Sequence, residues 1–190
     1  MRLKSIYCIR VDSSLFNGNP VAEVDLKANH PSMLYALRHG KQLPSNFYQL
    51  IANESGVSRD SVKWLIMKMI GARDEKVSIT IKINKKDYSK SQFKMSEDEK
   101  KAIQTATEKL FPDLYGDFYK DMGVVMQAME GDVLLDAMCD LVDQGILSLP
   151  IYDALYVEQQ HIKEAERALK VSWKKNLNVD FEPFVDVDTP

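Results

Sequence analysis

The sequence lacks several features that would place it in a common class at once. No apolar run approaches the roughly 20 residues that a membrane-spanning helix needs, and the first residues hold no apolar core of a secretory signal. It has no internal repeat and no low-complexity linker. The 25 basic and 28 acidic residues leave a formal net charge of −3, which gives no global electrostatic footprint for a nucleic acid. We therefore expect a cytoplasmic protein with no membrane partner.

The bulk composition is that of an ordinary folded domain. Hydrophobic residues make up 45% and charged residues 28% of the 190 residues. This length is typical of one domain, or of a compact domain with an inserted subdomain. Cysteine is scarce, and Cys8 and Cys139 lie in apolar segments without the spacing of metal ligands. We expect both to be reduced core residues in a cytosolic protein.

Apolar periodicity and turn residues predict an α+β fold. Strands are predicted over residues 6–11 and 21–26, an exposed strand over 76–88, and a hairpin over 146–157. Helices are predicted over residues 31–38, 47–53, 59–70, 97–110, 122–142 and 158–177, ahead of an acidic, partly disordered tail over 180–190. Ser58 is the predicted N-cap of the helix over 59–70, and Ser96 to Glu99 are typical of a capping box. Residues 1–40 and 121–190 then form an antiparallel sheet backed by helices, and residues 41–120 form a small, mostly helical insertion.

Two aspartates, Asp25 and Asp153, each end a β-like apolar segment. If the two strands are neighbours, their carboxylates converge at one edge of the sheet. Two-metal phosphoryl transfer needs anions that hold two divalent cations about 3.5–4 Å apart, and carboxylate oxygens are the ligands that Mg²⁺ prefers. The alternative interpretation is a pair of solvated carboxylates at strand ends.

Two cations, Arg59 and Lys63, lie in the first turns of the predicted helix 59–70. Residues four apart share one side of a helix, and the dipole at its start already favours anions. An arginine gives bidentate contacts to phosphate and a lysine gives a point charge. The pattern is therefore typical of a triphosphate clamp, and the alternative is an ordinary solvated helix face.

Taken in order, these segments resemble the palm and fingers of family A DNA polymerases and single-subunit phage-type RNA polymerases. Residues 23–35, with an aspartate followed by His-Pro and Leu-Tyr, are similar to motif A. Arg59 and Lys63 match the Arg-x-x-x-Lys of motif B. Residues 127–132 resemble the Gln-containing helix of the family, and residues 150–154 resemble motif C.

The resemblance implies a template-directed nucleotidyltransferase with a palm-like core and a fingers-like insertion. Its cofactor would be Mg²⁺, for which Mn²⁺ can substitute. Its partners would be nucleoside triphosphates and a nucleic acid primer–template or DNA template, in a bacterial or phage-infected cytoplasm. The implied roles are metal ligation by Asp25, the carbonyl of Leu26, and Asp153; catalysis by Asp25, Asp153 and Lys63; nucleotide binding by Arg59, Lys63, Met67 and His30; and nucleic-acid contact by Gln127 and Tyr152.

The chain also departs from the pattern of the family. Tyr152 replaces the histidine of motif C, where we expect its ring to pack against motif A, and Ala154 offers no further oxygen. Gly71 and Ala72 replace the Tyr-Gly pair of motif B. The chain begins inside the palm, so we expect a fragment, a reduced homologue, or one subunit whose thumb comes from a second polypeptide.

Two rival interpretations follow from these departures. In the first, the chain is a catalytically inactive, palm-derived subunit that binds protein or nucleic acid in a replication or transcription complex. In the second, it is an unrelated α+β interaction domain in which the two aspartates never meet.

The lysines of the middle segment could contact a phosphate backbone or form an ordinary exposed face; they are Lys82, Lys85, Lys86 and Lys90.

Overall fold

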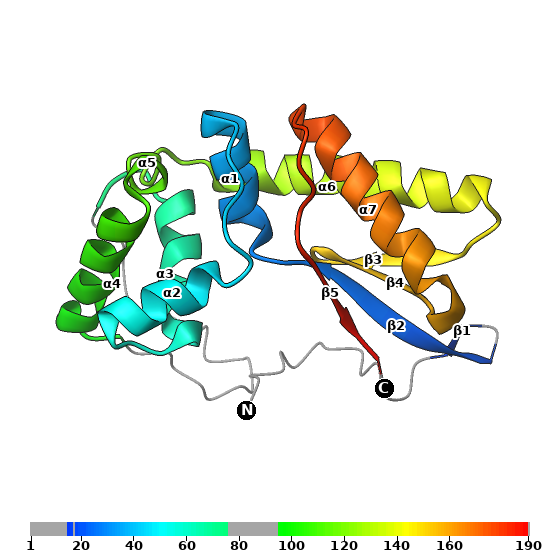
Figure 1. The fold of residues 1–190 in the computed structure, drawn as a ribbon, viewed down its shortest axis with the longest axis horizontal. Helices are drawn as coiled ribbons and strands as arrows, with labels where there is room; N and C mark the ends of the chain where they lie inside the picture. The colour runs from blue at the N-terminus through cyan, green and yellow to red at the C-terminus, as the bar shows by residue number, and fades with distance from the viewer. Residues whose placement is uncertain (1–14, 17, 76–94, 190) are drawn as a thin grey trace, which may run out of the picture. The chain divides into compact units, whose positions relative to one another are not determined.

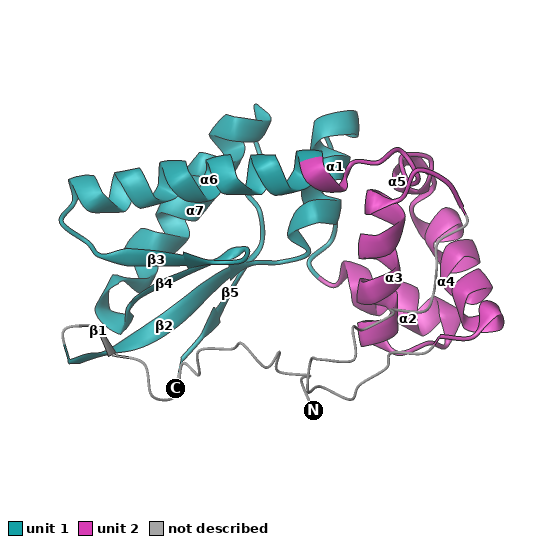
Figure 2. Ribbon diagram, turned by 180° about the vertical axis from the view of Figure 1, so that it is seen from behind, with its two compact units in different colours: residues 1–45, 125–190 teal, residues 46–124 magenta. Residues whose placement is uncertain are grey.

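The computed structural model describes residues 15–16, 18–75 and 95–189. The chain divides into two compact units, one of residues 1–45 with 125–190 and the other of residues 46–124 (Figure 2). This division falls close to the boundaries predicted from the sequence. The strands predicted over 6–11 and 76–88, together with Cys8 and the four middle lysines, lie outside the described residues.

The first unit contains an antiparallel sheet (Figure 1). Its strands are β1 (Leu15–Phe16), β2 (Asn19–Leu26), β3 (Ser148–Ile151), β4 (Ala154–Glu158) and β5 (Val185–Asp188). The order along the sheet is β1-β2-β4-β3, and β5 also pairs with β2. The described residues therefore confirm an α+β chain with an antiparallel sheet, together with the predicted strand over 21–26 and the hairpin over 146–157.

Strand β2 has a buried side and a more polar side. Ala22, Val24 and Leu26 are at most 1% exposed, whereas Glu23 and Asp25 between them are half-buried. Successive strand residues point to opposite faces, so the apolar set faces the helices that cover the sheet. The alternation fixes the register of the sheet, because a slip of one residue would exchange the two faces.

Among the described residues, three α-helices complete the first unit: α1 (Asn29–His39), α6 (Gly123–Asp143), whose first two residues belong to the second unit, and α7 (Ile162–Leu177), which a 3₁₀ turn over Gln159–His161 precedes. Helices α6 and α7 lie along one side of the sheet in both views (Figures 1 and 2), and α7 contacts β2 and β4. Polar bonds join the two helices. Asp136 accepts hydrogen bonds from Lys175 and Asn176, both at 2.9 Å, which hold the pKa of its carboxyl below the ordinary value.

The second unit is helical in its described residues. Its helices are α2 (Phe47–Ser55), α3 (Arg59–Gly71), α4 (Glu97–Leu110) and the short α5 (Pro112–Tyr115). The predicted caps are confirmed. The Ser58 hydroxyl accepts from the Ser61 N–H at the start of α3, and Ser96 and Glu99 form a reciprocal capping box at the start of α4. Within the described residues, no helix is long and apolar enough to cross a membrane.

Two predictions made from composition are wrong. The acidic tail is not partly disordered over its described residues, because Val185–Asp188 forms β5 and pairs with β2 from Glu23 to Leu26. Its alternating valines and aspartates suit a strand with one polar face. Cys139 is exposed on α6 and is not a core residue, because α6 carries apolar residues on its outer side as well as its inner one.

Two glycines make a matched pair for a test of packing inside the second unit. A Cβ added to Gly123 would lie 3.1 Å from the Gly71 Cα, whereas a Cβ added to Gly71 would lie 3.9 Å from the Gly123 Cα. We expect Gly123→Ala to lower the free energy of unfolding by about 1 kcal/mol or more, as overpacking does. Gly71→Ala should leave it unchanged or raise it slightly. Urea denaturation of both variants checks the difference, and equal effects would contradict the close approach.

Candidate functional site

Asp25 and Asp153 lie at the same end of the sheet. Asp25 is the last residue of β2 that pairs with β4, and its Cα partner there is Ala154, the residue after Asp153. The backbone N–H of Leu26 donates to the carbonyl oxygen of Asp153 at 3.4 Å. The two segments, 128 positions apart in the sequence, are thus adjacent through their backbones. The convergence of the two carboxylates themselves, which the rival interpretation denies, stays a prediction.

More carboxylates share the face of the sheet that carries Asp25. Glu23 lies on this face two residues earlier. On β5, Asp188 is directly opposite Glu23, and Asp186 is directly opposite Asp25. Sequence analysis did not include Glu23, Asp186 and Asp188 in the site. The alternation of valine and aspartate in residues 185–188 indicates a strand. The acidic composition of the tail favours disorder instead, and the prediction followed the composition.

Glu23 and Asp186 each have a partner, one on β4 and the other directly after β2. The Tyr156 hydroxyl of β4 donates to Glu23 Oε2 at 2.7 Å. The Lys27 ammonium lies 3.0 Å from Asp186 Oδ1. Like charges directly opposite each other on a sheet are destabilising, so these two contacts offset part of the repulsion on this face.

Tyr152 occupies an unusual backbone position beside Asp153. The two residues form the tight turn between β3 and β4, and Tyr152 has φ +56°. A non-glycine residue in this left-handed region costs on the order of 1 kcal/mol. Its side chain is 69% exposed, so the prediction that its ring packs against motif A is wrong. The turn instead presents the ring to solvent next to the candidate site.

His30 belongs to a buried polar cluster. Its Nε2 lies 3.1 Å from Glu130 Oε2, and the same oxygen accepts from Asn29 Nδ2 at 2.8 Å. Asn29 and His30 are 4% and 9% exposed. The cluster joins the start of α1 to α6, a few residues after Asp25. His30 therefore packs against Glu130, which sequence analysis did not identify as its partner.

Three of the four predicted nucleotide-binding residues, Arg59, Lys63 and Met67, lie in the second unit, whereas His30 lies in the first. Arg59 and Lys63 are exposed on α3, and the Arg59 guanidinium lies 5.7 Å from the centre of the Tyr48 ring. Met67 is half-buried one turn later. The two units are described separately, so the convergence of these residues on the two aspartates stays a prediction. Gln127 is exposed on α6 in the first unit, and its contact with nucleic acid also stays a prediction.

The residues that could hold a metal are Asp25, Asp153 and the carbonyl of Leu26. Carboxylate and carbonyl oxygens are suitable ligands for Mg²⁺, which keeps several of its waters in protein sites. Among the described residues, no group of three or more histidine, cysteine, aspartate or glutamate side chains is placed to hold a metal ion. A site here would therefore rest on two carboxylates, backbone oxygen and water.

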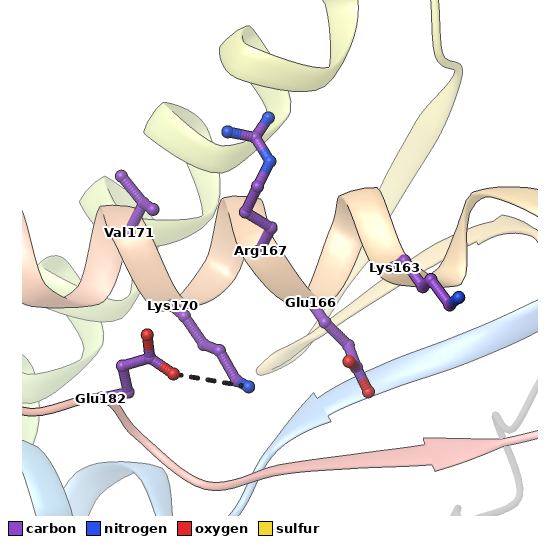
Figure 3. Close-up of a pocket in the computed structure, with 6 residues that line it drawn as sticks. All are labelled: Lys163, Glu166, Arg167, Lys170, Val171 and Glu182. Atoms are coloured by element: carbon purple, nitrogen blue, oxygen red, sulfur yellow. Dashed lines mark ion pairs between the residues drawn. The ribbon is translucent and has the colours of Figure 1, made fainter.

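A pocket elsewhere on the first unit carries none of the predicted site residues. It lies between α7 and the segment before β5 (Figure 3) and is lined by Lys163, Glu166, Arg167, Lys170, Val171 and Glu182. Lys170 pairs with Glu182 at 3.5 Å, and Arg167 pairs with Asp140 of α6 at 2.9 Å. Since the lining carries charges of both signs and two of its cations pair with carboxylates of the same unit, we assign no ligand to the pocket.

Comparison of the chain with models of protein families and with curated proteins found no match. The geometry of the site and the resemblance of its motifs are therefore what supports a function for this chain.

The cluster around Glu130 yields a stability prediction. We expect Glu130→Ala to lower the free energy of unfolding by about 1–3 kcal/mol. The substitution removes the carboxylate that accepts from the buried Asn29 amide and lies beside the buried Nε2 of His30. Glu130→Gln should cost less, since its carbonyl can still accept from Asn29. Urea denaturation measures both, with Glu166→Ala as a surface control. A loss in Glu130→Ala no larger than in the control would contradict the role of this cluster.

Proposed function

We propose that the chain is a palm-type nucleotidyltransferase unit that acts at the end of β2. The observation that carries the proposal is the register between β2 and β4, which sets Asp25 beside the turn that holds Asp153. Helices α6 and α7 cover one side of the sheet (Figure 1), and the alternation of β2 sets Asp25 on the opposite face from Ala22, Val24 and Leu26. Asp25 is half-buried on that face, which it shares with the fully buried Val21, and its Oδ1 is buried.

Each group of residues has a role in the proposed reaction. Asp25, Asp153 and the Leu26 carbonyl would hold two Mg²⁺ ions. Bound there, the ions would supply activation of the attacking 3′-hydroxyl and neutralisation of the leaving pyrophosphate. Arg59 and Lys63 would bind the triphosphate, the arginine through bidentate contacts and the lysine as a point charge. Met67 would border the nucleotide, and Gln127 would contact the primer–template.

The contacts of His30 and Tyr152 refine the roles proposed for them. With its Nε2 beside Glu130, His30 is better suited to fix the start of α1 than to contact a ribose. Exposed Tyr152 can stack on a base or sugar at the primer end, as aromatic rings do with single-stranded nucleic acid.

A second candidate function is that of an inactive, palm-derived subunit. It is favoured by Ala154, which provides no carboxylate beside Asp153, and by the engagement of His30 with Glu130. Such a subunit would bind protein or nucleic acid in a larger assembly. The two candidates differ in one measurable property, because only the catalytic one needs cations at Asp25 and Asp153.

Primer extension tests the catalytic role. On a short hairpin template with Mg²⁺ or Mn²⁺, we expect extension by the wild type and at least about a 100-fold loss in Asp25→Ala and Asp153→Asn. A bound metal supplies several kcal/mol of transition-state stabilisation, and each 1.36 kcal/mol is a factor of ten in rate. Asp188→Asn is the matched control, since it removes a carboxylate from the same face at the far end of β5. Equal activity in all variants would overturn the proposed roles.

Metal binding separates the two candidates if no extension is seen. In a thermal unfolding assay, Mn²⁺ should raise the melting temperature of the wild type, because a ligand that binds the folded state stabilises it. The rise should be absent in Asp25→Asn and Asp153→Asn and present in Asp188→Asn. Binding without extension would favour a split enzyme that needs its partner. No stabilisation in the folded wild type would contradict the catalytic proposal.

A further inference from the structure

Helix α6 exposes an apolar stripe along its length. Val124, Leu135 and Val142 are 74%, 60% and 64% exposed, Ala128 and Gly131 between them are also exposed, and Met138 is half-buried. We call these six residues the α6 stripe. They follow one another in alternating steps of four and three residues, which is the spacing of a coiled-coil seam. The other side of α6 packs into the first unit, where Met126, Val133 and Ala137 are fully buried.

The acidic residues of α6 are mostly directed to partners in the same chain. Glu130 contacts Asn29 and His30, and Asp136 is held by Lys175 and Asn176. Asp140 pairs with Arg167 of α7. Asp132 is exposed next to Gly131 at the edge of the stripe. A contiguous apolar face of this kind is typical of an interaction surface.

Gly131 is the residue that points to a second helix. A glycine within a helix costs about 1 kcal/mol relative to alanine, and α6 carries it near the middle of its 21 residues. Packing against the described residues does not require a glycine here, because a Cβ added to Gly131 would have no atom within 4 Å. Glycine does allow another backbone to approach closely. No described residue makes such an approach at Gly131, and a second copy of the chain can supply it.

The sizes of the residues in the α6 stripe are complementary to those of the same stripe running in the opposite direction. In an antiparallel pair centred at the level of Val133, Leu135 faces Gly131, Met138 faces Ala128, and Val142 faces Val124. Each large side chain meets a smaller or an equal one, which fills space without overlap. A parallel pair would instead set Leu135 against Leu135 and leave Gly131 opposite Gly131.

We infer that the α6 stripe is an interface between two antiparallel copies of this chain, related by a two-fold axis near Val133. The symmetry of such a contact needs only one self-complementary patch. The same geometry sets Val125 beside Cys139 of the second copy. It also sets the two Asp132 side chains beside each other near the axis, where like charges weaken the pair. This inference does not depend on the proposed nucleotidyltransferase activity.

Sedimentation equilibrium of the full chain tests the association. Because one helix pair is a small interface and the pair is expected to be weak, concentrations from ~10 μM to ~1 mM are needed. The wild type should dimerise, and Leu135→Glu should be monomeric throughout. Val171→Glu, at a side chain 54% exposed on α7, is the matched control and should dimerise like the wild type. Asp132→Asn should tighten the dimer roughly two- to fivefold.

Disulfide trapping tests the orientation. In a Cys8→Ser background, Val125→Cys should form a covalent dimer with Cys139 of the second copy under mild oxidation, because both positions are exposed. Cys139 alone should not cross-link, and neither should a Val171→Cys control. A cross-link through Cys139 alone would indicate a parallel pair and overturn the proposed geometry. A wild type that stays monomeric at every concentration, with folding verified by circular dichroism, would overturn the interface.

Discussion

The pairing of β2 on both of its edges is the constraint on which the first unit depends. On one edge it bonds to β4 over five residues, from Val21 to Asp25. On the other edge it bonds to β1 at its start and to β5 from Glu23 to Leu26. The chain segments that supply β4 and β5 both come from the far end of the sequence. The sheet therefore forms only when about the last 45 residues have paired with β2 near the start of the chain. Pairing between segments so far apart in the sequence is typical of slow folding.

The same pairing sets the position of the candidate site. The register that buries Ala22, Val24 and Leu26 necessarily turns Glu23 and Asp25 to the other face. The hairpin that follows β3 then brings Asp153 to the end of β2, since Ala154 is already the partner of Asp25. Core packing thus determines the neighbourhood of the two aspartates. No interaction between the carboxylates themselves is needed to bring them together.

Local sequence was sufficient to predict the elements whose signals are local. The helix caps at Ser58 and Ser96 and the hairpin over 146–157 each depend on residues within a few positions of one another. The partner of Asn29 and His30 lies about a hundred residues away on α6, and no periodicity identifies such a contact. Strand β5 was missed for the same reason, because four residues form a strand here only by pairing with β2.

Helix α6 shows a different limit of sequence-based reasoning. Apolar residues occur around most of its circumference, so the apolar pattern does not tell which side faces the core. Cys139 was therefore assigned to the core, although it is exposed. Only the positions of α7 and the sheet show that Met126, Val133 and Ala137 point inward. The apolar residues left outside are what makes an interface on α6 a testable idea.

The acidic face of the sheet carries an energetic cost. Asp25 faces Asp186 and Glu23 faces Asp188 across one pair of strands, an arrangement that like charges make unfavourable. Lys27 and Tyr156 offset part of that cost at Asp186 and Glu23. A divalent cation near Asp25 and Asp153 would offset more of it. Under the proposed function, the folded unit without its metals keeps electrostatic repulsion that binding then relieves, so metal affinity and fold stability are linked through the same carboxylates.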